Sequence, residues 1–171
     1  MKKINLAING FGRIGRTFLR KSLGDPSINI VAINDLTAPS TLAHLLKYDS
    51  IHGRFPGEIE FGDNFISIDN KKIEIIAEKD PSLLPWKKFE VEIVIESTGK
   101  FTKEEDAKKH IIAGAKKVII SAPATANIKS VVLGVNEHIL DGTEELISNA
   151  SCTTNNAAPM IALLRSEEHT S

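Results

Sequence analysis

Residues 8–16 read "INGFGRIGR" and place glycines at positions 10, 12 and 15, in the pattern G-x-G-x-x-G. The alternating apolar residues from Lys3 to Asn9 predict a strand that ends in a tight turn at Gly10. In a dinucleotide-binding turn, the first glycine permits the turn, the second lets the backbone approach a pyrophosphate, and the third lets helix and strand pack closely. The N–H groups of the following helix then face the phosphates. The stretch therefore predicts a phosphate-binding turn.

Asp35 ends the next predicted strand, "INIVAIND" at residues 28–35, and lies 20 residues after Gly15. A carboxylate in this place can bond both hydroxyls of an adenosine ribose and repels a 2′-phosphate, which favours NAD over NADP. The alternative is that the glycines form an ordinary strand-to-helix turn and Asp35 caps the next helix. Arg13, at the helix start, has two interpretations: it is solvated, or it bonds the pyrophosphate.

The rest of the chain continues the alternation of strands and helices. A helix is expected from about Ser40, and another from Thr102 to about Gly114, with Thr102 and Glu105 at capping-box spacing. Strands are expected at residues 64–68 and 71–78 around an Asp69-Asn70 turn, and at 89–97, 116–121, 131–136 and 144–150. This order predicts the α/β class, with a Rossmann-type doubly wound parallel sheet.

The composition excludes several classes of protein. The chain has 171 residues and a net charge of −1, so no basic field draws it to nucleic acid or to an anionic membrane. No run approaches the roughly 20 apolar residues of a membrane span. A single cysteine excludes an internal disulfide and is typical of a reduced, cytoplasmic protein. No cluster has metal-ligand spacing, so no metal is expected.

Cys152 follows the predicted strand at 144–150 and precedes residues that can begin a helix. The N–H groups at a helix N-terminus stabilise a thiolate, the nucleophilic form of cysteine. The hydroxyls of Ser151 and Thr153 could bind an anionic oxygen, so the arrangement suits covalent catalysis on a carbonyl. The alternative is that Cys152 is a small buried residue.

A nucleophilic cysteine needs a base, and the histidines are poor candidates. His44 and His110 lie in predicted helices, and His52 and His138 lie in loops. Histidines in such places are more often surface or cap residues than catalytic ones. The residues by themselves therefore name no base for Cys152.

Taken together, the motifs resemble the family of phosphorylating glyceraldehyde-3-phosphate dehydrogenases over residues 1 to about 164. Besides "INGFGRIGR", they are "AIND" (32–35), "KYDSIHGRF" (47–55), "ESTGKF" (96–101), "KKVIISAP" (116–123), "GVN" (134–136) and "SNASCTTNNAAP" (148–159). One departure is Asn156, where many members have a second cysteine that is not catalytic. This ordered set favours the catalytic interpretation of Cys152.

The resemblance implies a full set of cofactor contacts. Gly10, Gly12 and Gly15 form the turn, Arg13 and Ile14 bind the pyrophosphate region, and Asp35 binds the adenosine ribose. Lys79 and Phe101 lie on the adenine side, and Ser97, Thr98 and Ser121 contact the rest of the dinucleotide. Leu36 also matches the NAD-using pattern.

The resemblance also implies a reaction and an assembly. Glyceraldehyde 3-phosphate is oxidised with NAD and inorganic phosphate to 1,3-bisphosphoglycerate, by way of a thioester on Cys152, in glycolysis or gluconeogenesis. Ser151 and Thr153 match hydroxyls that help to bind phosphate. Family members are cytoplasmic homotetramers. A sister activity on erythrose 4-phosphate remains an alternative.

The resemblance divides the chain into an NAD-binding domain at residues 1–150 and the start of a catalytic domain at 151–164. The catalytic histidine of the family lies beyond this part, so the 171-residue chain is expected to be inactive, and a cofactor-binding fragment without catalysis is an alternative description. Residues 165–171, "RSEEHTS", equal the translation of a common sequencing adapter. They are interpreted as non-native, with a natural tail as the alternative, and His169 is given no role.

Overall fold

The structure, a computed structural model, describes residues 3–167. Its strands are β1 (Ile4–Asn9), β2 (Ile28–Asn34), β3 (Ile59–Gly62), β4 (Phe65–Ile68), β5 (Lys71–Ile76), β6 (Ile93–Glu96), β7 (Lys117–Ile120), β8 (Lys129–Ser130) and β9 (Leu146–Ser148). Its α-helices are α1 (Arg13–Ser22), α2 (Pro39–Lys47), α3 (Glu104–Ile112) and α4 (Cys152–Glu167), and short 3₁₀ helices occur at Pro81–Leu83 and Glu137–Ile139.

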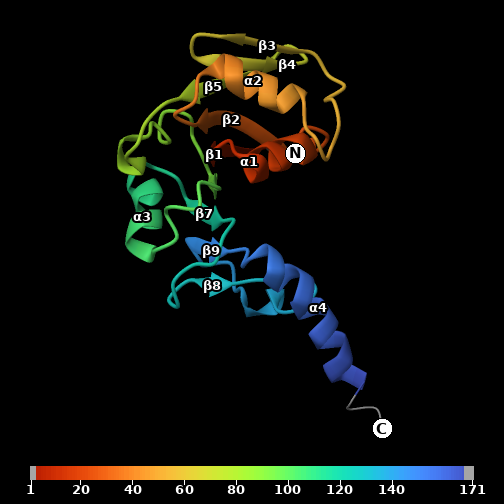
Figure 1. Ribbon diagram of the computed structural model, residues 1–171. Helices are drawn as coiled ribbons and strands as arrows, with labels where there is room; N and C mark the ends of the chain where they lie inside the picture. The colour runs from red at the N-terminus through yellow and green to blue at the C-terminus, as the bar shows by residue number, and fades with distance from the viewer. Residues whose placement is uncertain (1–2, 168–171) are drawn as a thin grey trace.

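Within residues 3–167 the strands form one nine-stranded sheet in the order β3-β4-β5-β2-β1-β6-β7-β9-β8 (Figure 1). The strands from β5 to β8 in this order are parallel, whereas β3 and β4 form an antiparallel meander on β5. The chain builds outward from β1 to β2 on one side and from β6 to β7 and β9 on the other. The order therefore reverses between β1 and β6, which confirms the doubly wound prediction and creates a ligand-binding switch point.

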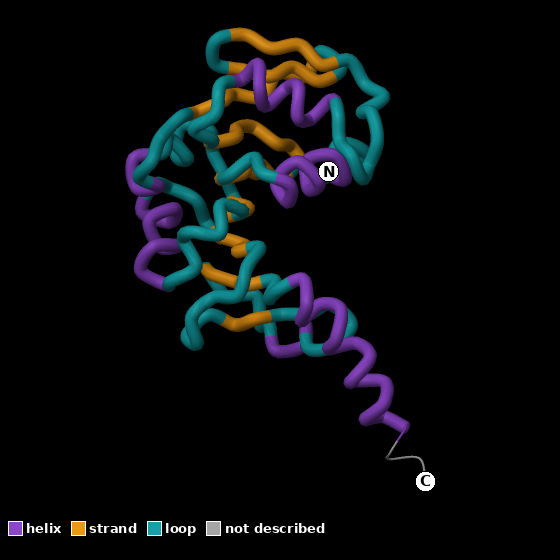
Figure 2. The backbone as a smooth tube through the Cα atoms, viewed as in Figure 1, coloured by secondary structure: helices purple, strands orange, loops and turns teal. Residues whose placement is uncertain are grey.

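Both faces of the sheet are buried, because successive side chains of a strand point to opposite faces. Leu6 and Ile8 of β1 belong to a core that includes residues of α1 and α2, such as Leu19 and Leu46. Ala7, between them, belongs to a second core with Trp86 and residues of α3. Figure 2 shows α4 extending away from these layers. None of the residues 152–165 is buried.

The turn between β4 and β5 confirms the prediction at Asp69 and Asn70. Both residues have positive φ angles, 48° and 65°. Two left-handed residues in a two-residue hairpin turn match the twist of the flanking strands, and Asp and Asn tolerate that conformation. The short strand β3, which pairs with β4, has no counterpart in the sequence prediction.

The prediction of a strand at residues 131–136 was wrong. The ladder ends with β8 at Ser130, and the N–H groups of Val135 and Asn136 both donate to the Val132 carbonyl. The Asn136 side chain closes the same turn, because its Oδ1 accepts from the Val132 N–H at 2.7 Å. Gly134, with φ of 82°, permits the bend, so an apolar composition here marks a turn rather than a strand.

The capping box predicted at Thr102 and Glu105 was also wrong. The N-cap of α3 is Lys103, and no side chain caps the helix. Thr102 remains outside the helix, where its carbonyl accepts from the Thr125 N–H at 3.2 Å. The three acidic residues of the first turn, Glu104 to Asp106, instead favour this helix start through the helix dipole.

Gly15 is required by the close approach of α1 to β1. A Cβ built on Gly15 would lie 2.3 Å from the Gly10 carbonyl oxygen, whereas a Cβ on the exposed Gly24 would meet nothing within 4 Å. Gly15→Ala should therefore lower the free energy of unfolding by roughly 1–3 kcal/mol, the usual penalty of overpacking. Urea unfolding measures this change. Gly24→Ala is the matched control, and equal midpoints for the two variants would contradict the argument.

Candidate functional site

A cleft of about 500 Å³ lies at the carboxyl ends of β1, β2 and β6. It brings together seven of the residues singled out in the sequence: Gly10, Gly12, Asp35, Lys79, Ser97, Thr98 and Phe101. Leu36 also lines it, together with Asn9, Asn34, Glu78 and Lys100, which the sequence prediction did not include. The cleft thus occupies the switch point of the sheet, where open α/β folds bind ligands.

Four predicted cofactor residues are not among those that line the cleft. Arg13 and Ile14 are the exposed first residues of α1, directly beyond the glycine turn. Gly15 is buried against β1. Ser121 follows β7 and donates its N–H to the Glu96 carbonyl at 2.9 Å. Arg13 and Ile14 therefore adjoin the cleft through the turn, while Ser121 lies one strand further along the same edge.

The glycine turn leaves the N-terminus of α1 accessible. The N-cap of this helix is Gly12, which has no side chain to bond the first N–H groups. A Cβ built on Gly12 would meet nothing within 4 Å, so the absence of a side chain here keeps space open rather than relieving a contact. Free N–H groups and the positive end of the helix dipole suit a phosphate group at this place.

Asp35 connects the end of β2 to the glycine turn. Its Oδ2 accepts from the Phe11 N–H at 2.7 Å, and its Oδ1 accepts from the Thr37 N–H at 2.9 Å. Each carboxylate oxygen has a further lone pair, so Asp35 can still accept hydrogen bonds from two ribose hydroxyls. The alternative that Asp35 caps the next helix fails, because the N-cap of α2 is Ala38 without a side-chain bond.

A buried polar network beneath the cleft was missed by the sequence prediction. Asn9, Glu96 and His110 are at most 1% exposed, and Asn9 and His110 are both hydrogen-bonded to Glu96. The expectation that His110 is a surface or cap residue was therefore wrong, because the inner face of α3 turns it into the core. A signal was present in the sequence, since Asn9, Asn34 and Glu96 each end an apolar strand.

Cys152 is exposed and is the first residue of α4, as the sequence predicted. The preceding Ala150 has a φ of 55°, a strained conformation for a residue with a Cβ, and turns the chain sharply out of β9. Ser151 caps the helix, because its Oγ accepts from the Thr154 N–H at 3.0 Å. The same Oγ lies 2.9 Å from the Thr153 hydroxyl. Two hydroxyls thus flank the thiol.

No histidine within residues 3–167 is hydrogen-bonded to Cys152. His52 pairs with Asp49, His110 is held in the buried network, and the ring of His44 contacts Tyr48. His169 lies outside the described residues. Over the same part of the chain, no group of three or more His, Cys, Asp or Glu side chains is arranged to hold a metal ion.

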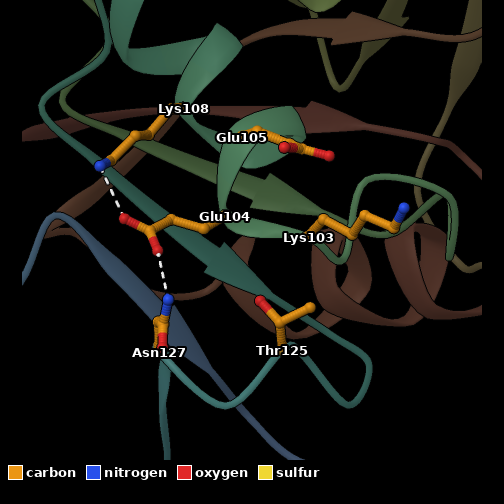
Figure 3. A pocket seen from close by; sticks show the side chains of 6 residues that line it. All are labelled: Lys103, Glu104, Glu105, Lys108, Thr125 and Asn127. Atoms are coloured by element: carbon orange, nitrogen blue, oxygen red, sulfur yellow. Dashed lines mark hydrogen bonds and ion pairs between the residues drawn. The ribbon is translucent and has the colours of Figure 1, made fainter.

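A second cavity, of about 400 Å³, lies between the start of α3 and Thr125–Asn127 (Figure 3). Glu104 accepts from Lys108 at 2.7 Å and from Asn127 at 3.2 Å. The bond from Lys108 is the largest cause of the lowered pKa of Glu104. Because these exposed groups already pair with one another, we assign no ligand to this cavity.

The fold and the cleft define a dinucleotide-binding domain of the Rossmann class. The family model described as glyceraldehyde 3-phosphate dehydrogenase, NAD binding domain, matches residues 4–104, and the chain belongs to this family. NAD is the cofactor of this domain, and the open space at Gly12 and the carboxylate of Asp35 fit its pyrophosphate and ribose.

Several similar curated proteins carry the name glyceraldehyde-3-phosphate dehydrogenase. The chain is 55% identical to the glyceraldehyde-3-phosphate dehydrogenase of Mycoplasma pneumoniae, over 95% of this chain and 49% of the relative. It is 52% identical to that of Geobacillus stearothermophilus, over 96% and 49%, and 54% identical to that of Thermotoga maritima, over 93% and 48%. The chain thus spans about half the length of these relatives. No helix in residues 3–167 has the length and apolar character to cross a membrane.

Gly12→Ala should weaken NAD binding without loss of stability. The added methyl group meets no atom within 4 Å beyond its chain neighbours, and it occupies space through which a pyrophosphate is expected to approach. We expect the Kd for NAD, measured by calorimetry, to rise at least about tenfold, because the phosphates can no longer reach the helix N–H groups. Gly24→Ala again serves as control. An unchanged Kd for Gly12→Ala would place the pyrophosphate elsewhere.

Proposed function

We propose that the protein oxidises glyceraldehyde 3-phosphate to 1,3-bisphosphoglycerate with NAD and inorganic phosphate, as a step of glycolysis. The observation that carries this proposal is the position of Cys152. Strand β9 runs parallel to β7, and β7 runs parallel to β6, so the turn after β9 lies at the same edge of the sheet as the cofactor cleft. An exposed thiol at this edge, at the N-terminus of a helix, is suited to covalent chemistry beside the cofactor.

In this proposal the thiolate of Cys152 attacks the aldehyde carbon: a carbon–sulfur bond forms, and the carbon–oxygen double bond becomes a single bond whose oxygen takes the electron pair. NAD, when bound, supplies the hydride acceptor for the oxidation that leaves a thioester on the cysteine. Inorganic phosphate then displaces the thiolate and releases the acyl phosphate. Ser151 and Thr153 are proposed to bind phosphate through their hydroxyls, which flank the thiol, and the helix N–H groups stabilise the thiolate.

We also propose roles for the cofactor residues. Asp35 accepts from the adenosine ribose, and Lys79 and Phe101 lie beside the adenine, since all three line the cleft. Arg13 and Ile14 contact the pyrophosphate from the first turn of α1. The remainder of the dinucleotide is contacted from the ends of β6 and β7, by Ser97, Thr98 and Ser121.

The proposed domain boundary lies between residues 150 and 151, with residues 151–164 as the start of a catalytic domain. The support is the strained turn at Ala150 and the lack of buried residues between positions 152 and 165. Met160, Ile161 and Leu164 are more than half exposed, which indicates a helix that packs against a further part of the protein. A cytoplasmic homotetramer is the assembly proposed from the family.

A second candidate describes the 171-residue chain by itself: it binds NAD without turnover. This is favoured because none of the histidines within residues 3–167 is hydrogen-bonded to Cys152. General acid–base catalysis typically increases the rate of a reaction by about 10²–10⁴-fold. Without a base bonded to Cys152 in residues 3–167, the chain is expected to leave the aldehyde unoxidised, while its cleft still binds the cofactor.

Cys152 should be alkylated faster in the folded chain than in the unfolded chain at neutral pH. It is exposed in the folded state, and only the folded state supplies the helix N–H groups that stabilise a thiolate. The rate of iodoacetamide labelling, followed by mass spectrometry with and without urea, measures the difference. Because Cys152 is the only cysteine, no other site contributes. Slower labelling of the folded chain would argue against a nucleophilic role.

Formation of NADH, followed by absorbance with glyceraldehyde 3-phosphate, NAD and phosphate, tests the two candidates. The 171-residue chain should form no NADH above the level of its Cys152→Ser variant, while both bind NAD. Phosphate-dependent NADH formation that the Cys152→Ser change abolishes would refute the description as a binding domain alone. Erythrose 4-phosphate, offered in the same assay, would reveal the sister activity.

A further inference from the structure

Three buried polar side chains are joined by hydrogen bonds at the carboxyl ends of β2, β1 and β6. Asn34 Nδ2 donates to Asn9 Oδ1 at 2.7 Å, and Asn9 Nδ2 donates to Glu96 Oε2 at 2.5 Å. Their exposed fractions are 6%, 1% and 1%. We call these three residues the polar bridge, because they connect three neighbouring strands at the cleft, which Asn9 and Asn34 line and Glu96 does not.

The two ends of the polar bridge reach opposite walls of the cleft. Asn34 bonds the backbone of Glu78 in both directions: Nδ2 donates to the carbonyl, and Oδ1 accepts from the N–H, each at 2.9 Å. At the other end, Glu96 Oε1 accepts from the Thr98 N–H at 2.8 Å and from its hydroxyl at 2.5 Å. Both Glu78 and Thr98 line the cleft. The bridge therefore links the wall that carries Lys79 to the wall that carries Phe101.

Trp86 and His110 fix the orientation of Glu96, which forms one end of the polar bridge. The indole N–H of Trp86 can only donate, and it donates to His110 Nδ1 at 3.0 Å. The proton of the neutral imidazole therefore resides on Nε2, which donates to Glu96 Oε2 at 3.0 Å. Asn9, His110 and the Thr98 N–H then all donate to Glu96. These bonds hold the Glu96 side chain in one orientation.

The same two strands contain a second asparagine pair that serves as an internal comparison. Asn29 Nδ2 donates to Asn5 Oδ1 at 2.9 Å, at the amino ends of β1 and β2. This pair is only half-buried and lies far along the strands from the cleft. Cross-strand pairing of β1 and β2 thus needs no buried carboxyl group. Since buried polar and ionic groups are also often replaceable by well-packed apolar residues without loss of stability, the polar bridge calls for another explanation.

We propose that the polar bridge sets the separation of the two cleft walls, so that Asn34, Asn9 and Glu96 are positioning residues for the adenosine half of NAD. This inference rests on the cofactor site proposed above. If the two cleft walls are already at the right distance, binding does not have to order them, and this cost in free energy is avoided. Glu96 and His110 are not among the residues that line the cleft, so they act only through Asn9 and Thr98.

The variant Glu96→Gln tests this role in the 171-residue chain. Whichever way its amide is turned, an NH₂ group replaces an acceptor and faces an existing donor, either the Thr98 N–H or those of Asn9 and His110. We expect the Kd for ADP, measured by calorimetry, to rise about tenfold, and the Kd for NAD by the same factor. Asn29→Ala, which removes the comparison pair, should leave both values within about twofold of the parent.

The outcomes separate the inference from the cofactor site itself. If the parent chain binds ADP and NAD, and Glu96→Gln binds them equally well, the polar bridge is not a positioning device. If the parent chain binds neither, the proposed cofactor site fails and the inference fails with it. Equal weakening by Asn29→Ala would also overturn the inference, because general loosening of the sheet would then explain the effect.

A second pair of variants applies if Glu96→Gln shows no cooperative urea transition. His110→Gln keeps an acceptor for Trp86 and a donor for Glu96 at a similar spacing, whereas His110→Leu removes both at similar size. The first should retain parent affinity for ADP, and the second should weaken it several-fold, although neither touches the ligand. Equal affinity of these two variants would overturn the proposal.

Discussion

The contact of Gly15 with the Gly10 carbonyl determines where α1 lies, and the site depends on that position. A Cβ at Gly15 would lie 2.3 Å from this oxygen, so only a glycine lets the helix come this close to β1. The approach places the helix N-terminus over the end of β1, with Gly12 facing open space. Asp35 then closes the turn by accepting from the Phe11 N–H. Backbone packing therefore fixes the shape of the turn and leaves the N-terminus of α1 accessible.

Polar groups gather at one edge of an otherwise apolar sheet. The strands bury aliphatic side chains on both faces, yet Asn9, Asn34 and Glu96 end three of them with buried polar groups. Such groups are tolerated because each finds a partner across the neighbouring strand or in the cleft wall. Cys152 lies at the same edge, beyond the strained Ala150. The cleft and Cys152 thus share one boundary of the parallel sheet.

Much of the fold and site was predictable from local patterns. The glycine spacing, the acid at Asp35 and the strand-to-helix change at Cys152 each reflect a requirement of the nearby backbone, and each was placed correctly. The predictions failed where partners far apart in the sequence decide. Thr102 pairs its carbonyl with Thr125 and does not cap α3, and Asn136 folds back on Val132 and ends the strand expected there. Spacing alone does not reveal such partners.

The sequence by itself determined the α/β class, the glycine turn between β1 and α1 and the cysteine at a helix start, because these follow from side-chain period, glycine geometry and neighbouring residues. Only the tertiary structure decided that His110 is buried rather than on the surface, and that Asn34, Asn9 and Glu96 form one bridge. His110 lies 14 positions from Glu96, and Asn9 lies 87 positions from it. Their meeting depends on the order of β2, β1 and β6 in the sheet and on which face of α3 packs inward, and neither is encoded in any local pattern.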